Sequence, residues 1–254
     1  MAGPAYKKKG MSSPSRKLMR RSDPLTSLLL VFPLFVIYQI GVLSMPSTYN
    51  GADLITSHML HLLHGNSGAY LAVNVVLALA FFVLVLVLRR NNSFDPRLFV
   101  PVLLESAIYA LTMGSLICFV MIDFLHIDPK LLIGLSTQQS PERAGAAAKI
   151  VLSLGAGVHE ELVFRLIMVG GGVWLFERVF GLRRWFSIVL AFAISSVLFS
   201  AAHHVIGGEP FHTGAFTYRI LCGLVFATIF QTRGFAVAVY THALYDIYVL
   251  LVRG

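Results

Sequence analysis

The chain has 254 residues, of which 57% are hydrophobic and only 13% are charged, and its formal net charge is +8. Soluble domains carry about 25% charged residues, so this composition excludes an ordinary soluble fold. The basic residues stand at the edges of apolar runs and no nucleic-acid-binding motif accompanies them, which favours membrane topology over nucleic-acid binding. Cys118 and Cys222 lie inside apolar runs and indicate small core residues rather than a disulfide or a metal pair.

Residues 1–23 form the first predicted segment, a disordered tail on the cytoplasmic side. Lysine and arginine are interspersed there with Gly, Ser and Pro, and such a segment cannot bury enough apolar surface to fold. The apolar run that follows is long and no small-residue cleavage site clearly ends it. We therefore expect it to be an uncleaved first span rather than a signal peptide.

Seven apolar stretches are predicted to cross the bilayer as helices. Several reach the roughly 20 residues that a span needs, and a helix satisfies its own backbone polar groups in hydrocarbon. The short stretches 53–64 and 130–135 could instead lie at the interface or form an eighth span. No repeat or linker divides residues 24–254, which are interpreted as one all-α, polytopic helix-bundle domain. The predicted spans are 25–45, 70–88, 98–122, 150–175, 186–206, 216–230 and 235–252.

The orientation follows from the lysine and arginine residues outside the spans or near their ends, which are all of them except Arg165. With the tail inside, 14 of them lie on the inner side and five on the outer side. Cytoplasmic loops carry the excess of positive charge, so the N-terminus is predicted inside and the C-terminus outside. The expected location is a bacterial inner membrane.

Ionisable side chains within the fourth, fifth and seventh predicted spans are the candidate site residues. Such groups cost several kcal/mol in hydrocarbon unless they are paired, which makes each a functional candidate. At a rise of about 1.5 Å per residue, four of them (Glu160, His203, His242 and Asp246) fall in the outer half of the bilayer, where they could meet in one cavity. The candidate residues are Glu160 and Glu161, His203, and His242 and Asp246.

Spacing along the fourth predicted span separates two roles. Glu161 and Arg165 are four residues apart, the arrangement of an intrahelical ion pair. Glu105 in the third span is an alternative acidic partner for Arg165. Glu160 is rotated by about 100° from Glu161, so one glutamate can face a cavity while the other supports the scaffold.

These residues resemble the three motifs of the CPBP family, which comprises the CAAX proteases and bacteriocin-processing enzymes also called abortive-infection proteins. The family pattern is a double glutamate with an arginine four residues later, then Phe-x-x-x-His, then His-x-x-x-Asn or a similar polar residue. Order and spacing match within about residues 144–250. Here the motifs read Glu160-Glu161-Leu-Val-Phe-Arg165, Phe199-Ser-Ala-Ala-His203 and His242-Ala-Leu-Tyr-Asp246.

The resemblance implies a glutamate-type intramembrane endopeptidase that acts on a membrane-anchored protein or peptide. Glu160 with His203 would activate a water molecule, and His242 with Asp246 would stabilise the oxyanion. Several bacterial branches resemble partners of C-terminal sorting systems, which implies processing of a sorting signal or a prepeptide. The eukaryotic branch trims prenylated C-termini on the cytoplasmic side, which suits the predicted topology less well. The supporting residues would be Glu161, Arg165 and Phe199.

Asp246 stands where the family commonly has asparagine. An oxyanion stabiliser must donate a hydrogen bond, which a carboxyl group does only while protonated. Asp246 could instead stay ionised and orient His242, as the acid of a catalytic triad orients its histidine. The protonated donor is the favoured interpretation.

Three alternatives use the same residues. Glu160, His203 and His242 could bind zinc, which these ligand types suit. A proton-coupled transporter also places acids and histidines in its spans, but no inverted repeat or matched pair of broken helices is visible. A non-catalytic immunity protein is disfavoured because all the catalytic positions are filled.

Overall fold

The computed structural model describes residues 23–45, 52–90, 93–127, 145–207 and 209–253. Every regular element within these ranges is helical, which confirms the all-α prediction. The predicted tail, apart from Asp23, and the short stretch 130–135 lie outside the described residues.

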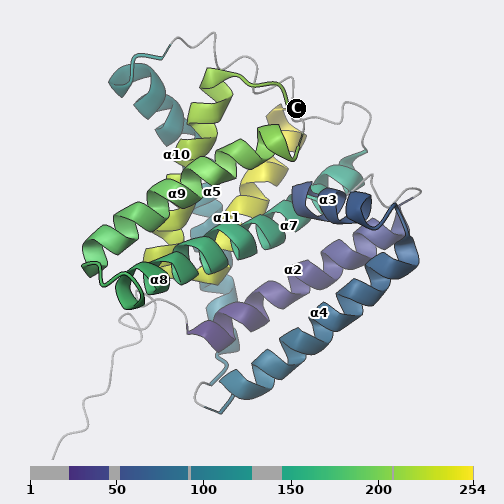
Figure 1. Cartoon of the computed structure of the whole chain (residues 1–254). Helices are drawn as coiled ribbons and strands as arrows, with labels where there is room; N and C mark the ends of the chain where they lie inside the picture. Colours follow the sequence, from purple (N-terminus) through teal and green to yellow (C-terminus); the bar gives the residue numbers. More distant parts are fainter. Residues whose placement is uncertain (1–22, 46–51, 91–92, 128–144, 208, 254) are drawn as a thin grey trace, which may run out of the picture.

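The N-terminal part consists of α2 (Pro24–Ser44), α3 (Leu54–Leu62) and α4 (Ser67–Leu88). Asp23 caps α2 by accepting the Thr26 N–H at 3.0 Å, and Pro24 occupies the first helical turn, where its missing N–H is not needed. Asn66 caps α4 in the same way through the N–H of Ala69. Helices α2 and α4 lie side by side, and the short α3 joins them at one end (Figure 1).

The remaining helices include the three that carry the predicted motifs. A short 3-10 turn, Pro96–Leu98, leads into α5 (Phe99–Phe119), which continues as a π-helical turn over Val120–Phe124. The first motif lies in α7 (Ala146–Glu161) and in the π-helical turns over Leu162–Gly171, which continue α7 and lead into α8 (Gly172–Arg178). The second motif lies in α9 (Arg184–Val205) and the third in α11 (Phe235–Tyr248), which ends in a π-helical turn over Val249–Arg253. Helix α10 (Thr213–Arg233) connects α9 to α11 and carries no motif.

Six helical stretches are long and apolar enough to cross a membrane, and they correspond to six of the seven predicted spans. The predicted span 150–175 is instead a composite of α7, π-helical turns and α8, in which the α-helical part before the interruption has only 16 residues. π-helical turns are frequent at functional sites. The six stretches are Pro24–Ser44, Ser67–Leu88, Pro96–Phe124, Arg184–Val205, Thr213–Arg233 and Phe235–Val252.

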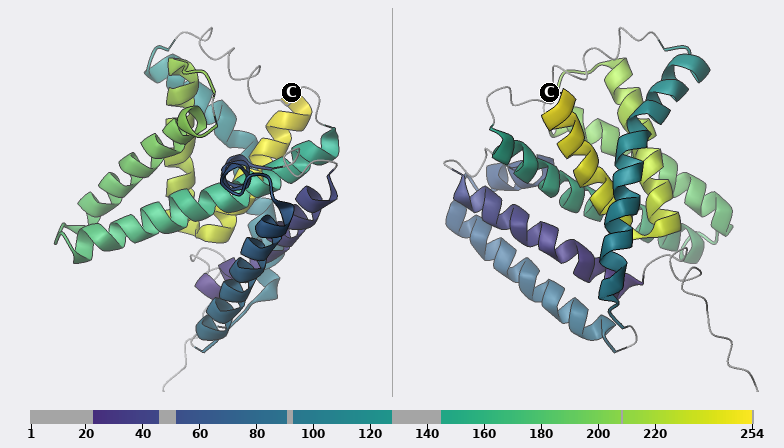
Figure 2. Two further views of the ribbon diagram at one scale, coloured as in Figure 1. Left: turned by 45° about the vertical axis from the view of Figure 1, so that its right-hand side comes forward. Right: turned by 180° about the vertical axis from the view of Figure 1, so that it is seen from behind.

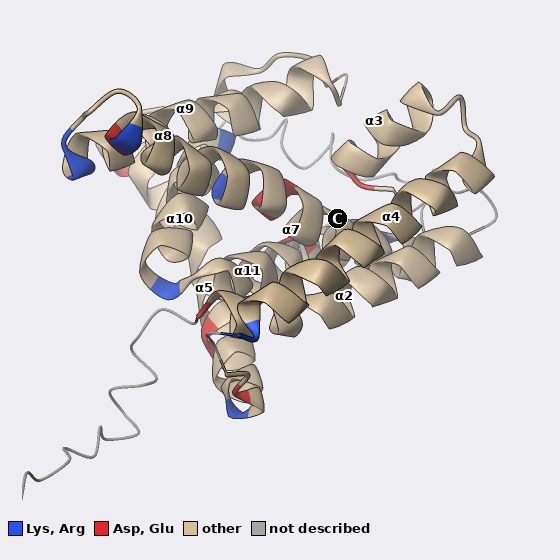
Figure 3. Cartoon of the chain, turned by 60° about the horizontal axis from the view of Figure 1, so that its bottom comes forward, with Lys and Arg blue, Asp and Glu red and all other residues tan. Residues whose placement is uncertain are grey.

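Helices α7 and α11 form the centre of the bundle. Helix α11 packs against α5 and α7, while α2 packs against α7 and α9 pairs with α10 (Figures 1 and 2). Most large side chains of α4 face outward and are apolar, as expected of a helix that contacts lipid. Charged residues gather near helix ends and at a few interior positions, which leaves the long helix faces apolar (Figure 3).

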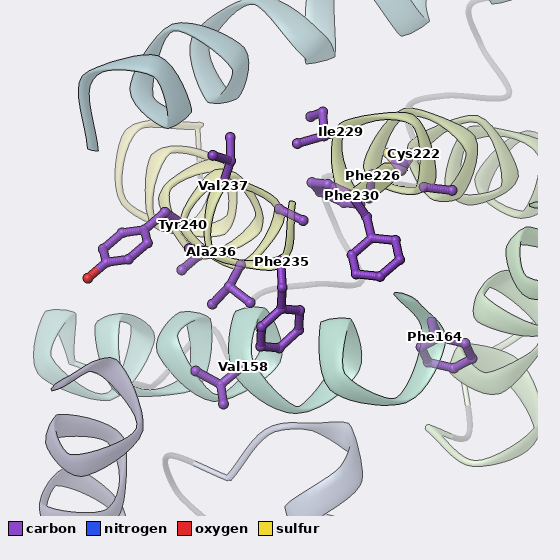
Figure 4. Close-up of a cluster of buried hydrophobic side chains, with 14 of the residues drawn as sticks. Val158, Phe164, Cys222, Phe226, Ile229, Phe230, Phe235, Ala236, Val237 and Tyr240 are labelled. Carbon is purple, nitrogen blue, oxygen red and sulfur yellow. The ribbon is translucent and has the colours of Figure 1, made fainter. Parts of the chain in front are cut away.

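Two glycines shape how α11 meets α10 and α7. Gly234 joins α10 to α11 with φ of 104°, a conformation that side chains disfavour, and so reverses the chain within one residue. A Cβ atom at Gly157 would lie 2.8 Å from the Ala243 Cβ and 2.9 Å from the Val239 carbonyl oxygen, so only glycine lets α7 approach α11 this closely. Buried side chains such as Val158, Phe226 and Phe235 fill the space between α7, α10 and α11 (Figure 4).

Candidate active site

The close approach of α7 and α11 places the two glutamates beside His242. Glu160 and Glu161 form the last α-helical positions of α7 and are 3% and 0% exposed. His242 lies in the middle of α11 and is also buried. Asp246, one helical turn further along α11, is half-buried.

The His242 ring lies between carboxylates at both of its nitrogens. Its Nδ1 is 2.8 Å from Glu161 Oε1, and because a carboxylate can only accept, this nitrogen is the donor. Its Nε2 faces Asp246 Oδ2 at 3.4 Å and Glu160 Oε2 at 3.9 Å. Glu161 therefore orients the ring, while Glu160 and Asp246 meet at the opposite nitrogen.

Arg165 completes the support behind Glu161. Its Nε lies 3.2 Å from Glu161 Oε2 and both side chains are fully buried, which confirms the predicted ion pair four residues apart. The alternative, in which Glu105 pairs with Arg165, is wrong. Glu105 instead accepts a hydrogen bond from Arg233, with 2.7 Å between Arg233 Nη2 and Glu105 Oε2. Glu105 on α5 therefore ties this helix to the end of α10.

Aromatic rings surround the His242 imidazole. Phe226 of α10 stacks on it with ring centres 4.5 Å apart, and Phe199 of α9 meets it edge-on at 6.0 Å. The Arg165 guanidinium lies 4.5 Å from the centre of the Phe199 ring, within the range of a cation–π contact. The motif phenylalanine thus supports both the arginine and the histidine.

His203 is linked to the other predicted site residues through Phe199. Its Nδ1 lies 3.0 Å from the Phe199 carbonyl oxygen, and its ring meets the Phe199 ring edge-on at 5.2 Å. The Phe199 ring contacts both His203 and His242 and so links the two histidines. The prediction that His203 and Glu160 activate a water together stays a prediction.

The zinc alternative requires Glu160, His203 and His242 to gather around one point. Among the described residues there is no group of three or more His, Cys, Asp or Glu side chains placed to hold one metal ion. Glu160, His203 and His242 therefore do not form a metal site in this structure. Glu160 Oε2 is buried and has no hydrogen-bond partner there, which leaves an acceptor facing His242.

Two features of the site were not predicted from the sequence. Phe226 is one of many aromatic residues in apolar spans, and nothing in its spacing marks it as the residue that stacks on His242. Asp53, in the loop before α3, lies 3.0 Å from His159, the residue next to Glu160. In the sequence, Asp53 is marked only as a polar residue before an amphipathic stretch, and that pattern predicts a helix cap rather than a contact with His159.

The start of α7 and the end of α11 lie at the same end of the bundle. The Lys149 ammonium group donates to the Leu250 carbonyl oxygen at 2.9 Å. Glu160 and His242 therefore lie between this end and the α8 end of the helical run.

Residues 143–248 match the family model described as Type II CAAX prenyl endopeptidase Rce1-like, and this range contains all three motifs. No curated protein and no solved structure matches the chain. The family consists of peptide hydrolases, which favours the protease interpretation over a transporter or a non-catalytic protein. The chain is thus a multi-pass integral membrane protein whose residues 143–248 form a domain of the Rce1-like type II CAAX prenyl endopeptidase (CPBP) family.

Proposed function

We propose that this chain is an intramembrane endopeptidase in which Glu160 activates the attacking water and His242 with Asp246 stabilises the oxyanion. The observation that carries the proposal is the His242 ring, which Glu161 holds at Nδ1 while Nε2 faces Glu160 and Asp246. A buried imidazole with one fixed donor and one nitrogen opposite an unpartnered carboxyl oxygen has the elements of acid–base amide hydrolysis.

The proposed reaction begins with a water molecule at Glu160. One proton of the water moves to Glu160 as the water oxygen bonds to the carbonyl carbon, and the carbonyl oxygen becomes the oxyanion. His242, protonated at Nε2 as well as at Nδ1, and a protonated Asp246 donate hydrogen bonds to that oxyanion. The intermediate then re-forms the carbonyl and breaks the C–N bond, while the proton on Glu160 passes to the departing amine. His203 is assigned the second hydrogen bond to this water.

The proposed substrate is a membrane-anchored protein cleaved near its C-terminus, as in processing of a sorting signal or a prepeptide. Purified chain in liposomes would be incubated with membranes from cells that lack it, and new peptide termini identified by mass spectrometry. A farnesylated fluorogenic peptide ending in a CAAX sequence serves as a defined probe, because the description of the matching family names a CAAX prenyl endopeptidase. An unprenylated copy and a transmembrane peptide are the matched comparisons.

The expected result is a small set of new termini that wild-type protein produces and a Glu160→Gln preparation does not. Cleavage of the transmembrane peptide or the prenylated probe decides which anchor the site accepts. Identical termini from both preparations would reject the proposed function.

Asp246 provides a test of the oxyanion assignment. Asparagine keeps the size and the hydrogen-bond donor, so Asp246→Asn is expected to retain most of the activity, whereas Asp246→Leu loses about 10²- to 10³-fold, as when an oxyanion donor is removed. Both rates are measured on the cleaved probe and normalised to folded protein. An asparagine variant as inactive as the leucine variant would instead assign Asp246 the role of an ionised group that orients His242.

We also propose that the N-terminus is cytoplasmic and that the site lies in the outer half of the bilayer. The support is the excess of basic residues on the tail side. In a chain whose native cysteines are replaced, Thr213→Cys at the exposed start of α10 should react with a membrane-impermeant thiol reagent from outside spheroplasts. Arg183→Cys, at the exposed opposite end of α9, should react only after permeabilisation. The reverse pattern would invert the orientation.

A further inference from the structure

Asp53 is a fully buried carboxylate outside the matched family region. It caps α3 by accepting from the N–H groups of Ile55 and Thr56 at 2.9 and 3.2 Å, which uses its Oδ1. The Thr56 hydroxyl donates to Oδ2 at 2.9 Å. A helix cap alone needs only one carboxyl oxygen and is commonly exposed, so the remaining contacts of Oδ2 call for a separate explanation.

The second function of Oδ2 is a contact across to α7. It lies 3.0 Å from Nδ1 of His159, whose ring meets the Tyr38 ring of α2 edge-on at 5.0 Å. Because the carboxylate accepts, His159 Nδ1 donates. Asp53 and His159 thus form a pair buried between α2, α3 and α7, in which Asp53 is 0% and the His159 side chain 14% exposed.

A glycine in α7 makes room for this pair. A Cβ atom at Gly155 would lie 2.6 Å from Asp53 Oδ2 and would also collide with the ring of Tyr38. Burial by itself would raise the pKa of Asp53, but the adjacent His159 and hydrogen bonds from Tyr38 and Thr56 lower it to about 2. The carboxyl is therefore ionised at neutral pH and fully committed to these partners.

The pair acts on the turn of α7 that carries the proposed general base. His159 precedes Glu160 directly, so anchoring the imidazole fixes the backbone from which the Glu160 side chain extends. The negative charge of Asp53 also lies close enough to act on Glu160. Glu160 Oε2 has no hydrogen-bond partner among the described residues, so its position depends on how its own helix turn is held.

We propose that Asp53 is a positioning residue that holds Glu160 in place through His159, so that the N-terminal helices outside residues 143–248 complete the active site. The inference rests on the proposed function for its kinetic consequence. Misplacement of a reacting group by about 1 Å can cost about 100-fold in rate, so a residue outside the family region can affect catalysis strongly without contacting the substrate.

The kinetic test uses the farnesylated peptide, or the transmembrane peptide if that is the one cleaved. Asp53→Ala is expected to lower kcat by about 10- to 100-fold with little change in KM, because substrate contacts are untouched. Asp53→Asn should recover most of the activity, since its amide oxygen can still cap α3 and its amide nitrogen can donate to His159 Nδ1 when the ring proton moves to Nε2. Asn66→Ala, which removes the exposed cap of α4, is the matched control and should keep wild-type kcat.

A double-mutant cycle with His159→Phe separates a positioning role from general loss of stability. If Asp53 acts through His159, adding Asp53→Ala to His159→Phe lowers kcat no further, whereas independent effects would multiply. Rates are normalised to the folded fraction measured by thermal melting. Wild-type kcat in Asp53→Ala, or multiplied losses in the cycle, would overturn the proposal.

An infrared measurement tests the same inference without any substrate. The carboxyl band of Glu160 is identified as the band missing from the spectrum of Glu160→Gln. It should shift in Asp53→Ala and stay in place in Asn66→Ala, and an unshifted band in Asp53→Ala would count against positioning. If Glu160→Gln cleaves as fast as wild type, the proposed function fails, while the infrared result still decides whether Asp53 controls the surroundings of Glu160.

Discussion

Replacing Glu160 with alanine is expected to lower peptide hydrolysis by about 10²- to 10⁴-fold, the contribution typical of a general base, while the bundle stays folded. The side chain is buried beside His242, yet its Oε2 has no hydrogen-bond partner in the described structure. Its removal therefore breaks no hydrogen bond of that oxygen, and the 3.9 Å ion pair with His242 is too long for the fold to depend on it. The measurement is the cleavage rate per folded molecule, with thermal melting in detergent as the check on folding.

The matched control for this change is Glu177→Ala. Glu177 on α8 pairs with the exposed Arg184 at 3.8 Å and lies outside the proposed site. It should keep wild-type activity and melting behaviour. A well-folded Glu160→Ala chain that cleaves at near the wild-type rate would remove Glu160 from the mechanism.

Replacing Arg165 with alanine is expected to destabilise the protein by about 3–5 kcal/mol, the usual effect of breaking a buried ion pair by removing one partner. Glu161 would then be left as a buried carboxylate facing only His242. The guanidinium also packs on the Phe199 and Phe226 rings, at 4.5 and 5.3 Å, so packing is lost together with charge. The result should appear as reduced membrane abundance and a lower melting temperature, more than as reduced specific activity of the surviving protein.

The control for Arg165 is Arg184→Ala, which removes the cation of an exposed pair. Exposed ion pairs contribute about 0.2–1 kcal/mol, so its melting should change little. Equal stability of the two variants, both near wild type, would show that the pair of Arg165 with Glu161 does not stabilise the bundle.

The pairs that form within one helix were predictable from the sequence. Arg165 meets Glu161, and Asp246 lies beside His242, because residues four apart share a helix face. The roles assigned to these side chains stay predictions. The alternative that paired Arg165 with Glu105 was wrong, because a contact between helices depends on which helices are neighbours and how each is rotated.

What the sequence by itself determined is the class of structure: helical spans of sufficient length, their approximate limits, and three motifs of ionisable residues within them. Hydrocarbon forces helices to satisfy their backbone internally, so composition and length suffice for that conclusion. Only the tertiary structure decided which residues meet between helices, such as His242 with Glu161 and Asp53 with His159. Lipid is as apolar as the helix surfaces, so helix rotation depends on small residues that permit close packing, as Gly157 does, rather than on hydrophobic periodicity.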